Sequence, residues 1–461
     1  MNIAGNVLSA VFWGLLFLSL LVFVHEGGHY LMARLFGVRV TEFYLGLPCR
    51  FKLFHKSKTR GTEVGVTPLL LGGYNRICGM EQNPDELSAD VLRIVQREGR
   101  VEVASIAQEL EIEEGRAYSI LISLADLAAV APYYNPELGE SPNQREYPAA
   151  FQTVSRDADM LTEYDAGHDF DAPETTQAGE ARPVDDASAL LEHDRSHTYV
   201  GISVPKRIAI LVAGPLVNLL LAFLLVTATY MTTEYHVPVA GNVLESVESG
   251  SAAESAGLMP GDGIKRIGDV DTNSWSEVRA EIDRNAKDTG SFDVTYVRDG
   301  VEGIAHVSLS DTERQESRMG VTVKTEPYRL GLVDSMRGAL NYAGMVGSFA
   351  AKLIMPQHTM EVLDQSSSVV GISVMASQAA ASGFADVIAF IAAISMSLGF
   401  MNLLPIPPLD GGKILIELIQ VIIRKPLSMK AQTAVSYVGL AFFLFIFIVA
   451  VRNDVFRFII G

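Results

Sequence analysis

Four long apolar blocks most constrain how this chain of 461 residues can fold. A helix needs about 20 predominantly apolar residues to cross the hydrocarbon core of a bilayer, and each block reaches about that length. The sequence therefore predicts a polytopic α-helical membrane protein with four transmembrane helices and soluble segments between them. With their flanks, we assign these helices to residues 1–36, 207–232, 387–412 and 433–452.

The basic residues orient these helices, because lysine and arginine favour the cytoplasmic side of a membrane. Residues 1–8 contain neither, which also argues against a cleaved secretory signal peptide, whereas the region after the first helix is basic. Further basic residues precede the second helix and separate the third from the fourth: Lys206, Arg207, Arg424, Lys425 and Lys430. Alternation of the helices then predicts that both termini lie outside the cell.

The formal net charge of −18 belongs to one segment. Residues 81–196 hold 26 acidic and 8 basic side chains and no lysine, so the rest of the chain is neutral overall. Taken whole, the net charge of −18 excludes a protein that wraps DNA or binds a membrane surface through a polybasic patch. Cys49 and Cys78 are too few for a disulfide framework, and the ligand spacing of a structural zinc site is missing near them.

The first helix carries the pattern His25-Glu26-x-x-His29 near its cytoplasmic end. On a helix, histidines four residues apart share one face and can hold one Zn²⁺, and the adjacent carboxylate can take a proton from zinc-bound water. Ionisable groups at the end of an apolar run normally face a polar cavity. The alternative is that both histidines snorkel to the interface and Glu26 pairs with Arg34. The two glycines between the histidines indicate a close backbone approach or local flexibility.

A zinc site needs a third protein ligand, for which Asp410 is the candidate. It follows Pro405-Ile406-Pro407-Pro408 at the inner end of the third helix, on the membrane face predicted for His25. The prolines leave backbone carbonyls unpaired, which a bilayer tolerates only beside protein or a water-filled cavity. The alternative is a simple turn that ends the helix.

Together these motifs resemble the site-two protease family of intramembrane zinc metalloproteases, in its bacterial regulator-of-sigma-factor protease branch. The matching motifs occur in order as His25-Glu26-x-x-His29, Gly61-Thr62-Glu63 with Pro68 to Tyr74, Gly214-Pro215-x-x-Asn218, and Asn402 followed by Leu409-Asp410-Gly411. The resemblance implies that His25, His29 and Asp410 bind zinc and that Glu26 is the general base.

The resemblance also implies a membrane-associated β-sheet in residues 37–80 and a set of substrate-binding residues. Addition of a substrate strand to this sheet would extend an unwound peptide, since a transmembrane helix must open before water can attack a peptide bond. The residues implied to bind the substrate are Asn402, Pro405, Gly72 and Gly73.

Residues 236–326 alternate apolar and polar side chains between turns and resemble a PDZ domain, a small β-barrel with a peptide-binding edge. Binding of a peptide C-terminus and a plug over the active site are both open interpretations. The family branch often has two such domains, and one is visible here. Residues 330–386 follow, for which we expect an interfacial helix and a linker.

Residues 81–135 read as three helices and a short strand, and they resemble a winged helix-turn-helix. The recognition helix would offer Glu113, Glu114 and one cation, Arg116, so we do not expect nucleic-acid binding and favour a cytoplasmic protein partner. Residues 136–200 are acidic and poor in aromatics, which predicts a disordered linker. From this charge we expect deletion of residues 81–196 to spare zinc binding and proteolysis.

We interpret the chain as a zinc endopeptidase of the bacterial cell membrane, embedded in the lipid bilayer, that cuts transmembrane protein substrates. The resemblance implies anti-sigma factors or remnant signal peptides as substrates. One competing hypothesis is a non-catalytic membrane scaffold that binds partners through its PDZ-like and winged-helix-like modules, and the other is a membrane-tethered transcription regulator. The complete set of ligands and base argues against the first, and the missing basic face argues against the second.

Overall fold

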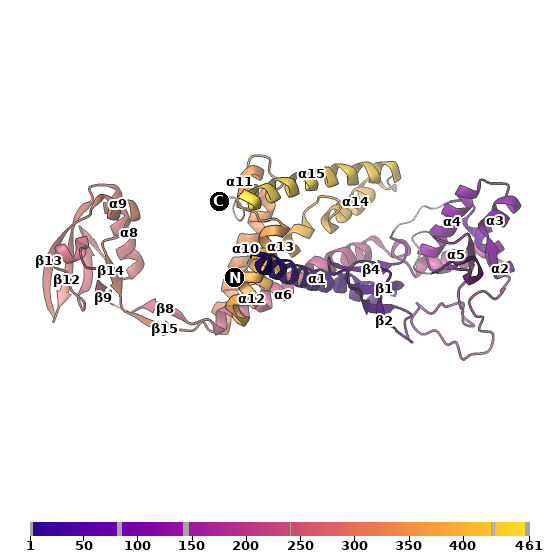
Figure 1. The fold of residues 1–461 in the computed structure, drawn as a ribbon, viewed down its shortest axis with the longest axis horizontal. Helices are drawn as coiled ribbons and strands as arrows, with labels where there is room; N and C mark the ends of the chain where they lie inside the picture. Colours follow the sequence, from indigo (N-terminus) through magenta and orange to yellow (C-terminus); the bar gives the residue numbers. More distant parts are fainter. Residues whose placement is uncertain are drawn as a thin grey trace. The chain divides into compact units, whose positions relative to one another are not determined.

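The computed structural model of the chain describes residues 3–80, 85–141, 147–239, 241–425, 427 and 429–456. Parts of the segments predicted above, among them 81–84 and 142–146, lie outside the described residues. The chain divides into two compact units, one formed by Tyr230–Ser335 and one by the residues before and after it (Figure 1).

Among the described residues, four helices are long and apolar enough to cross a membrane: α1 (Ile3–Leu35), α6 (Val204–Thr232), α13 (Phe384–Leu403) and α15 (Met429–Val455). Each coincides with one predicted transmembrane helix. The assignment of residues 387–412 to a single helix is wrong at its end, because α13 stops at Leu403 before the prolines. Asp410 instead begins a separate helix, α14 (Asp410–Ile423).

A four-stranded sheet lies beside α1 and has the strand order β2-β3-β1-β4. Its strands are β1 (Val40–Leu45), β2 (Leu53–Lys56), β3 (Glu63–Val66) and β4 (Gly73–Ile77). Strand β1 pairs in parallel with β3 and antiparallel with β4, which makes β4 an edge strand. The sheet therefore lies where the sequence predicts it, and its association with a membrane stays a prediction.

The predicted linker within residues 330–386 is wrong, because this segment is mostly helical. Its helices are α10 (Leu332–Lys352), α11 (Thr359–Gln365) and α12 (Val369–Ser382). Helix α12 packs along α1, where a Cβ added at Gly14 would lie 2.2 Å from Ser373 Oγ. Small residues thus allow α1 and α12 to pack closely. A search for long apolar blocks does not detect a helix that packs in this way.

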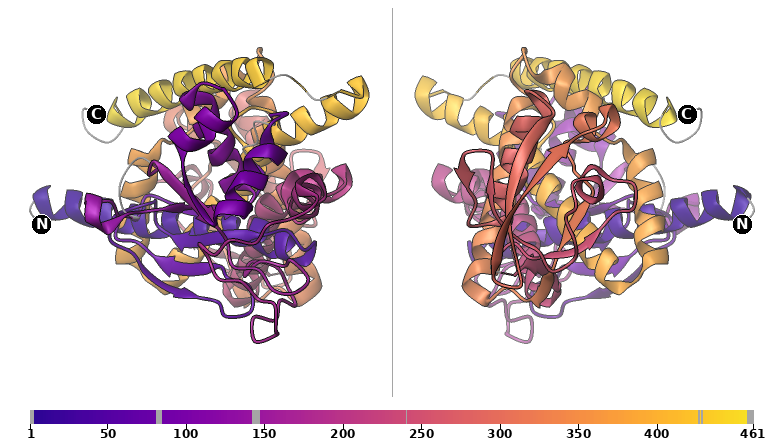
Figure 2. Two further views of the ribbon diagram at one scale, coloured as in Figure 1. Left: turned by 90° about the vertical axis from the view of Figure 1, so that its right-hand side faces the viewer. Right: turned by 90° about the vertical axis from the view of Figure 1, so that its left-hand side faces the viewer.

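The three helices predicted in the acidic insertion are present as α2 (Ser88–Glu98), α3 (Val103–Glu109) and α4 (Glu114–Asp126). They pack on a three-stranded sheet with the order β5-β7-β6 (Figure 2, left). The strands are β5 (Arg100–Glu102), β6 (Val130–Tyr133) and β7 (Ala150–Thr153). Because β7 is the central strand, the folded insertion extends beyond the predicted boundary at residue 135.

The prediction of a disordered linker over residues 136–200 is wrong for the residues that the structure describes. Besides β7, the segment contains the 3₁₀ turns η1 (Pro136–Leu138) and η2 (Tyr199–Gly201) and helix α5 (Ala187–Ser196), which packs against α2. Two of its aspartates, Asp165 and Asp194, are buried in ion pairs with Arg39 and Arg156. Composition misleads here because it does not reveal which carboxylates form buried ion pairs with arginines.

The unit Tyr230–Ser335 is a β-rich domain with its own apolar core (Figure 2, right). Its main sheet has the order β11-β10-β12-β13, and two further strand pairs are β14-β9 and β15-β8. In chain order its elements are β8 (Tyr235–Pro238), β9 (Leu244–Val247), α7 (Ala252–Ser255), β10 (Gly263–Ile267), β11 (Val270–Asp271), α8 (Trp275–Lys287), β12 (Ser291–Arg298), β13 (Val301–Ser308), α9 (Asp311–Glu316), β14 (Val321–Val323) and β15 (Thr325–Tyr328).

Candidate metal centre

Three buried side chains meet where α1 and α14 approach each other. His25 and His29 project from one face of α1, and Asp410 is the first residue of α14. Asp410 Oδ2 lies 2.9 Å from His25 Nε2 and 3.2 Å from His29 Nε2, and the two nitrogens are 3.2 Å apart. Within the described residues, no other cluster of three or more His, Cys, Asp or Glu side chains is arranged to hold a metal ion.

The geometry of this cluster fits a tetrahedral zinc site. Zinc bonds of about 2.0–2.2 Å to nitrogen and oxygen place the ligand atoms about 3.3–3.6 Å apart, close to the observed separations. His29 Nδ1 lies 2.7 Å from the carbonyl oxygen of Ile210, which can only accept a hydrogen bond. In the neutral ring the proton is therefore on Nδ1, and the lone pair of Nε2 faces His25 and Asp410, as a metal ligand requires.

Helix α6 supports both histidines with polar groups. Besides the carbonyl of Ile210 on His29, it supplies Asn218, whose Nδ2 lies 3.5 Å from His25 Nδ1. Ser395 of α13 donates to the backbone carbonyl of Asn218 at 2.8 Å. The Ile210 carbonyl orients the imidazole of His29 by accepting from its unused ring nitrogen. Asn218 does the same for His25 when its amide oxygen, which is buried without a partner among the described residues, faces Nδ1.

Two glycines allow α1 and α6 to come this close. A Cβ added at Gly28 would lie 2.4 Å from the carbonyl oxygen of Ala213, and one added at Gly214 would lie 2.3 Å from His29 Nε2. A side chain at either position would force the helices or the imidazole to move. The close approach predicted for the glycine pair is thus confirmed at Gly28, whereas a Cβ at Gly27 would only touch Phe43 at 3.6 Å.

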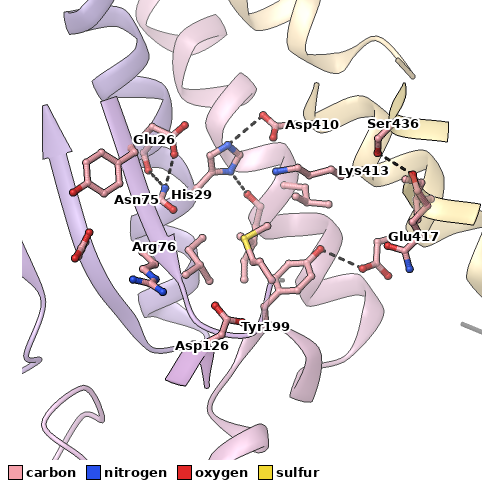
Figure 3. A pocket seen from close by; sticks show the side chains of 18 of the residues that line it. Glu26, His29, Asn75, Arg76, Asp126, Tyr199, Asp410, Lys413, Glu417 and Ser436 are labelled. Carbon is pink, nitrogen blue, oxygen red and sulfur yellow. Dashed lines mark hydrogen bonds and ion pairs between the residues drawn. The ribbon is translucent and has the colours of Figure 1, made fainter. Parts of the chain in front are cut away.

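Glu26 is held by the edge strand β4. Asn75 Nδ2 donates to Glu26 Oε2 at 2.7 Å and to the Glu26 backbone carbonyl at 2.9 Å (Figure 3). Arg34 donates instead to the Tyr164 carbonyl, at 2.7 Å, and to Thr62. Among the described residues no ion pair joins Glu26 to Arg34, so the snorkelling interpretation that required this pair is wrong.

A cavity of about 730 Å³ opens beside the cluster and is lined by Glu26, His29 and Asp410 (Figure 3). Its volume falls within the range of about 300–1,000 Å³ that is usual for binding pockets. Further charged residues line it from β1, β4, the insertion and α14: Glu42, Arg76, Asp126, Lys413 and Glu417. The ionisable groups at the end of α1 therefore face a polar cavity, as the sequence predicts.

Comparison with known proteins decides the family of the chain. A family model described as Peptidase family M50 matches residues 13–446. The chain belongs to peptidase family M50. It is 27% identical over 446 residues to the zinc metalloprotease RasP of Shouchella clausii, and the aligned region covers 95% of this chain and 96% of the relative. It is 26% identical over 452 residues, again 95% and 96% of the two chains, to the regulator of sigma-W protease RasP of Bacillus subtilis.

This M50 peptidase is a zinc metalloendopeptidase of the membrane, as the sequence predicts. The structure brings together four of the predicted site residues, His25, Glu26, His29 and Asp410. The four predicted substrate-binding residues do not line the cavity described above. Their positions differ: Gly72 donates its N–H to Ser19 Oγ of α1, Gly73 begins β4, Asn402 lies in the last turn of α13, and Pro405 is exposed in the following loop.

Sequence reasoning missed three residues of this M50 site: Asn75, Gly214 and Lys413. Gly214 belongs to the motif Gly214-Pro215-x-x-Asn218, which gives this glycine no role by itself; its role follows only from its distance to His29. Lys413 lies one turn after Asp410 and lines the cavity. A single asparagine in a strand has no spacing signal that would single out Asn75.

Proposed function

We propose that His25, His29 and Asp410 hold the zinc ion and that Glu26 is the general base of an intramembrane endopeptidase. The observation that carries this proposal is the convergence of the three ligand atoms within 3.2 Å, beside a cavity that Glu26 also lines. When bound, zinc lowers the pKa of a coordinated water toward about 7 and polarises the scissile carbonyl. Glu26 takes the proton of the attacking water and passes it to the leaving amine.

The proposed substrates are single-span membrane proteins, cut within or next to the transmembrane segment. The site supports this class because His25 and His29 lie in an apolar helix long enough to span a bilayer. Strand β4, which begins at Gly73, is an edge strand whose Asn75 contacts Glu26, so a peptide added to this edge would lie beside the base. We further propose that Gly72, Asn402 and Pro405 guide the unwound segment toward it.

Anti-sigma factors and remnant signal peptides are the proposed natural substrates. Support for the first comes from the relative named a regulator of sigma-W protease. The proposed location is the bacterial cell membrane, with both termini outside and the metal centre at the cytoplasmic end of α1. This orientation is supported by the basic residues that follow α1 and precede α6.

We propose two accessory modules, a PDZ-like domain in residues 236–326 and a winged-helix-like domain in the insertion. The second is supported by the order of α2, β5, α3, α4, β6 and β7 and by the three-stranded sheet. Its partner is a cytoplasmic protein rather than nucleic acid, because Arg116 at the start of α4 is paired with Asp85 at 2.9 Å.

The test is cleavage of a purified single-span substrate in detergent micelles or proteoliposomes, with the cut site mapped by mass spectrometry. We expect the wild type to cut within or beside the transmembrane segment and Glu26→Gln to lose cleavage while keeping its zinc. Glu109→Gln, which makes the same chemical change on an exposed side chain of the insertion, is the control. Undiminished cleavage by Glu26→Gln would reject the assigned base, and no cleavage by the wild type of any transmembrane substrate would favour the scaffold hypothesis.

A further inference from the structure

Asn75 makes the closest polar contact to the proposed base. Its amide nitrogen lies 2.7 Å from Glu26 Oε2 and 2.9 Å from the Glu26 carbonyl oxygen (Figure 3). Building on the proposed function, we infer that Asn75 is a positioning residue that fixes the carboxylate of Glu26 for proton transfer during peptide hydrolysis.

The sheet that carries Asn75 is docked on α1 by stacked aromatic rings. Asn75 lies opposite Phe43 in the antiparallel pair of β4 and β1. The ring of Phe43 stacks between Phe23 and Tyr30 of α1, with centroid distances of 4.5 and 4.9 Å. Glu26 lies between these two aromatic residues in the sequence, so the same stack that docks the sheet also sets the distance from Asn75 to Glu26.

The contact occupies one oxygen of the Glu26 carboxylate. The amide nitrogen of Asn75 can only donate, and a carboxylate oxygen accepts from it. It engages Oε2, and within the described residues no hydrogen bond reaches Oε1, which leaves that oxygen to accept the proton of water. A glutamate side chain has several rotatable bonds. Holding it in one rotamer keeps the carboxylate in the orientation that proton transfer needs at every turnover.

A purely structural role is the competing explanation, because the bond to the Glu26 carbonyl also ties β4 to α1. Three substitutions separate the two roles. Asn75→Asp keeps the shape and replaces the donor with a carboxylate, Asn75→Val removes the donor and favours a strand, and Asn75→Gln keeps the donor. Each variant is measured for zinc content and for kcat and KM on a single-span substrate in micelles.

We expect Asn75→Asp and Asn75→Val to lower kcat about ten- to a hundredfold, the loss that removal of one hydrogen bond to a charged group produces. KM and zinc content should stay within about twofold of the wild type, and Asn75→Gln should recover part of kcat. Unchanged kcat in Asn75→Asp and Asn75→Val would overturn the inference. A fall in kcat together with loss of zinc or a raised KM would overturn it as well, because it would mark a structural role.

The comparison with Glu26→Gln keeps this inference distinct from the proposed function. If Glu26→Gln is inactive and the Asn75 variants are fully active, only the positioning role fails. If Glu26→Gln is active, the assignment of the base fails and the role of Asn75 fails with it. Combining Asn75→Val with Glu26→Gln should cause no further loss beyond Glu26→Gln alone, because Asn75 acts through that carboxylate.

Discussion

Replacing Asp194 with asparagine should release the acidic insertion from the rest of its unit. Arg39, which lies between α1 and β1, donates to Asp165 at 2.6 and 2.7 Å and to Asp194 at 3.1 Å. Arg156 donates to both oxygens of Asp194, at 2.6 and 3.0 Å. All four side chains are buried, so this network fastens the insertion to the end of the helix that carries His25 and His29, two of the proposed metal ligands.

The size of the effect follows from burial. Burial alone would raise the pKa of Asp194, but the charges of Arg156 and Arg39 outweigh it and hold the pKa below its ordinary value, so the carboxylate is charged at neutral pH. Removing one charge from such a network leaves the others unpaired and costs about 3–5 kcal/mol. At about 1.4 kcal/mol for each factor of ten, the population with the insertion detached should rise by about 10² to nearly 10⁴.

Hydrogen exchange of the purified protein in detergent measures this population, because buried amides exchange through local opening. We expect amides of α5 and β7 to exchange faster in Asp194→Asn by at least a hundredfold (about 3 kcal/mol). The control is Glu109→Gln, which breaks an exposed pair with Arg97 at 2.7 Å in the same domain and should change little, since solvent screens that pair. Equal exchange in the two variants would refute the account of a buried anchor.

Three further predictions concern the metal centre and the anchor. Gly214→Ala places a methyl group 2.3 Å from His29 Nε2, so zinc retention should fall and cleavage should drop about a hundredfold; metal analysis and cleavage assays test this. Folding lowers the pKa of Asp194, so its contribution to docking is complete above the ordinary carboxyl pKa of about 3.9 and is lost only as pH falls toward the lower folded value. Exchange protection, corrected for intrinsic exchange rates, should therefore be constant from about pH 5 to 8. Deletion of residues 81–196, which composition alone predicts to be harmless, should reduce zinc retention and cleavage because Arg39 loses both carboxylate partners.

Each of these three predictions has an outcome that would contradict it. Full activity and zinc content in Gly214→Ala would show that the helices separate without cost. Loss of exchange protection between pH 5 and 8 would mean that the anchor depends on a different titrating group. A deletion variant with normal zinc and normal cleavage would restore the expectation drawn from composition.

The cluster of proposed zinc ligands could be predicted from sequence because such chemistry leaves a spacing pattern. His25 and His29 are four residues apart on one helix, and Asp410 follows a proline-rich break that a bilayer tolerates only beside a cavity. The three helices of the insertion and the four long apolar helices were predictable for a similar reason, since apolar periodicity and block length are local properties.

The missed features depend on contacts between residues far apart in the chain. Arg39 meets Asp165 and Asp194 across 126 and 155 residues, so the acidic composition of residues 136–200 predicted disorder where a buried network folds the segment. Asn75 reaches Glu26 from a different element, 49 residues away. In both cases the residue types are ordinary, and only their partners give them a role.

The most direct test of the central claim is the zinc content of purified variants after dialysis against a moderate chelator. We expect about one zinc per chain in the wild type and in Glu26→Gln, and less than about a tenth of that in Asp410→Asn, because a site of two histidines loses the third ligand that zinc requires. Asp386→Asn, a matched change at the exposed start of α13, should keep its zinc. Full zinc content in Asp410→Asn, or its absence from the wild type, would contradict the assignment of His25, His29 and Asp410 as the metal site.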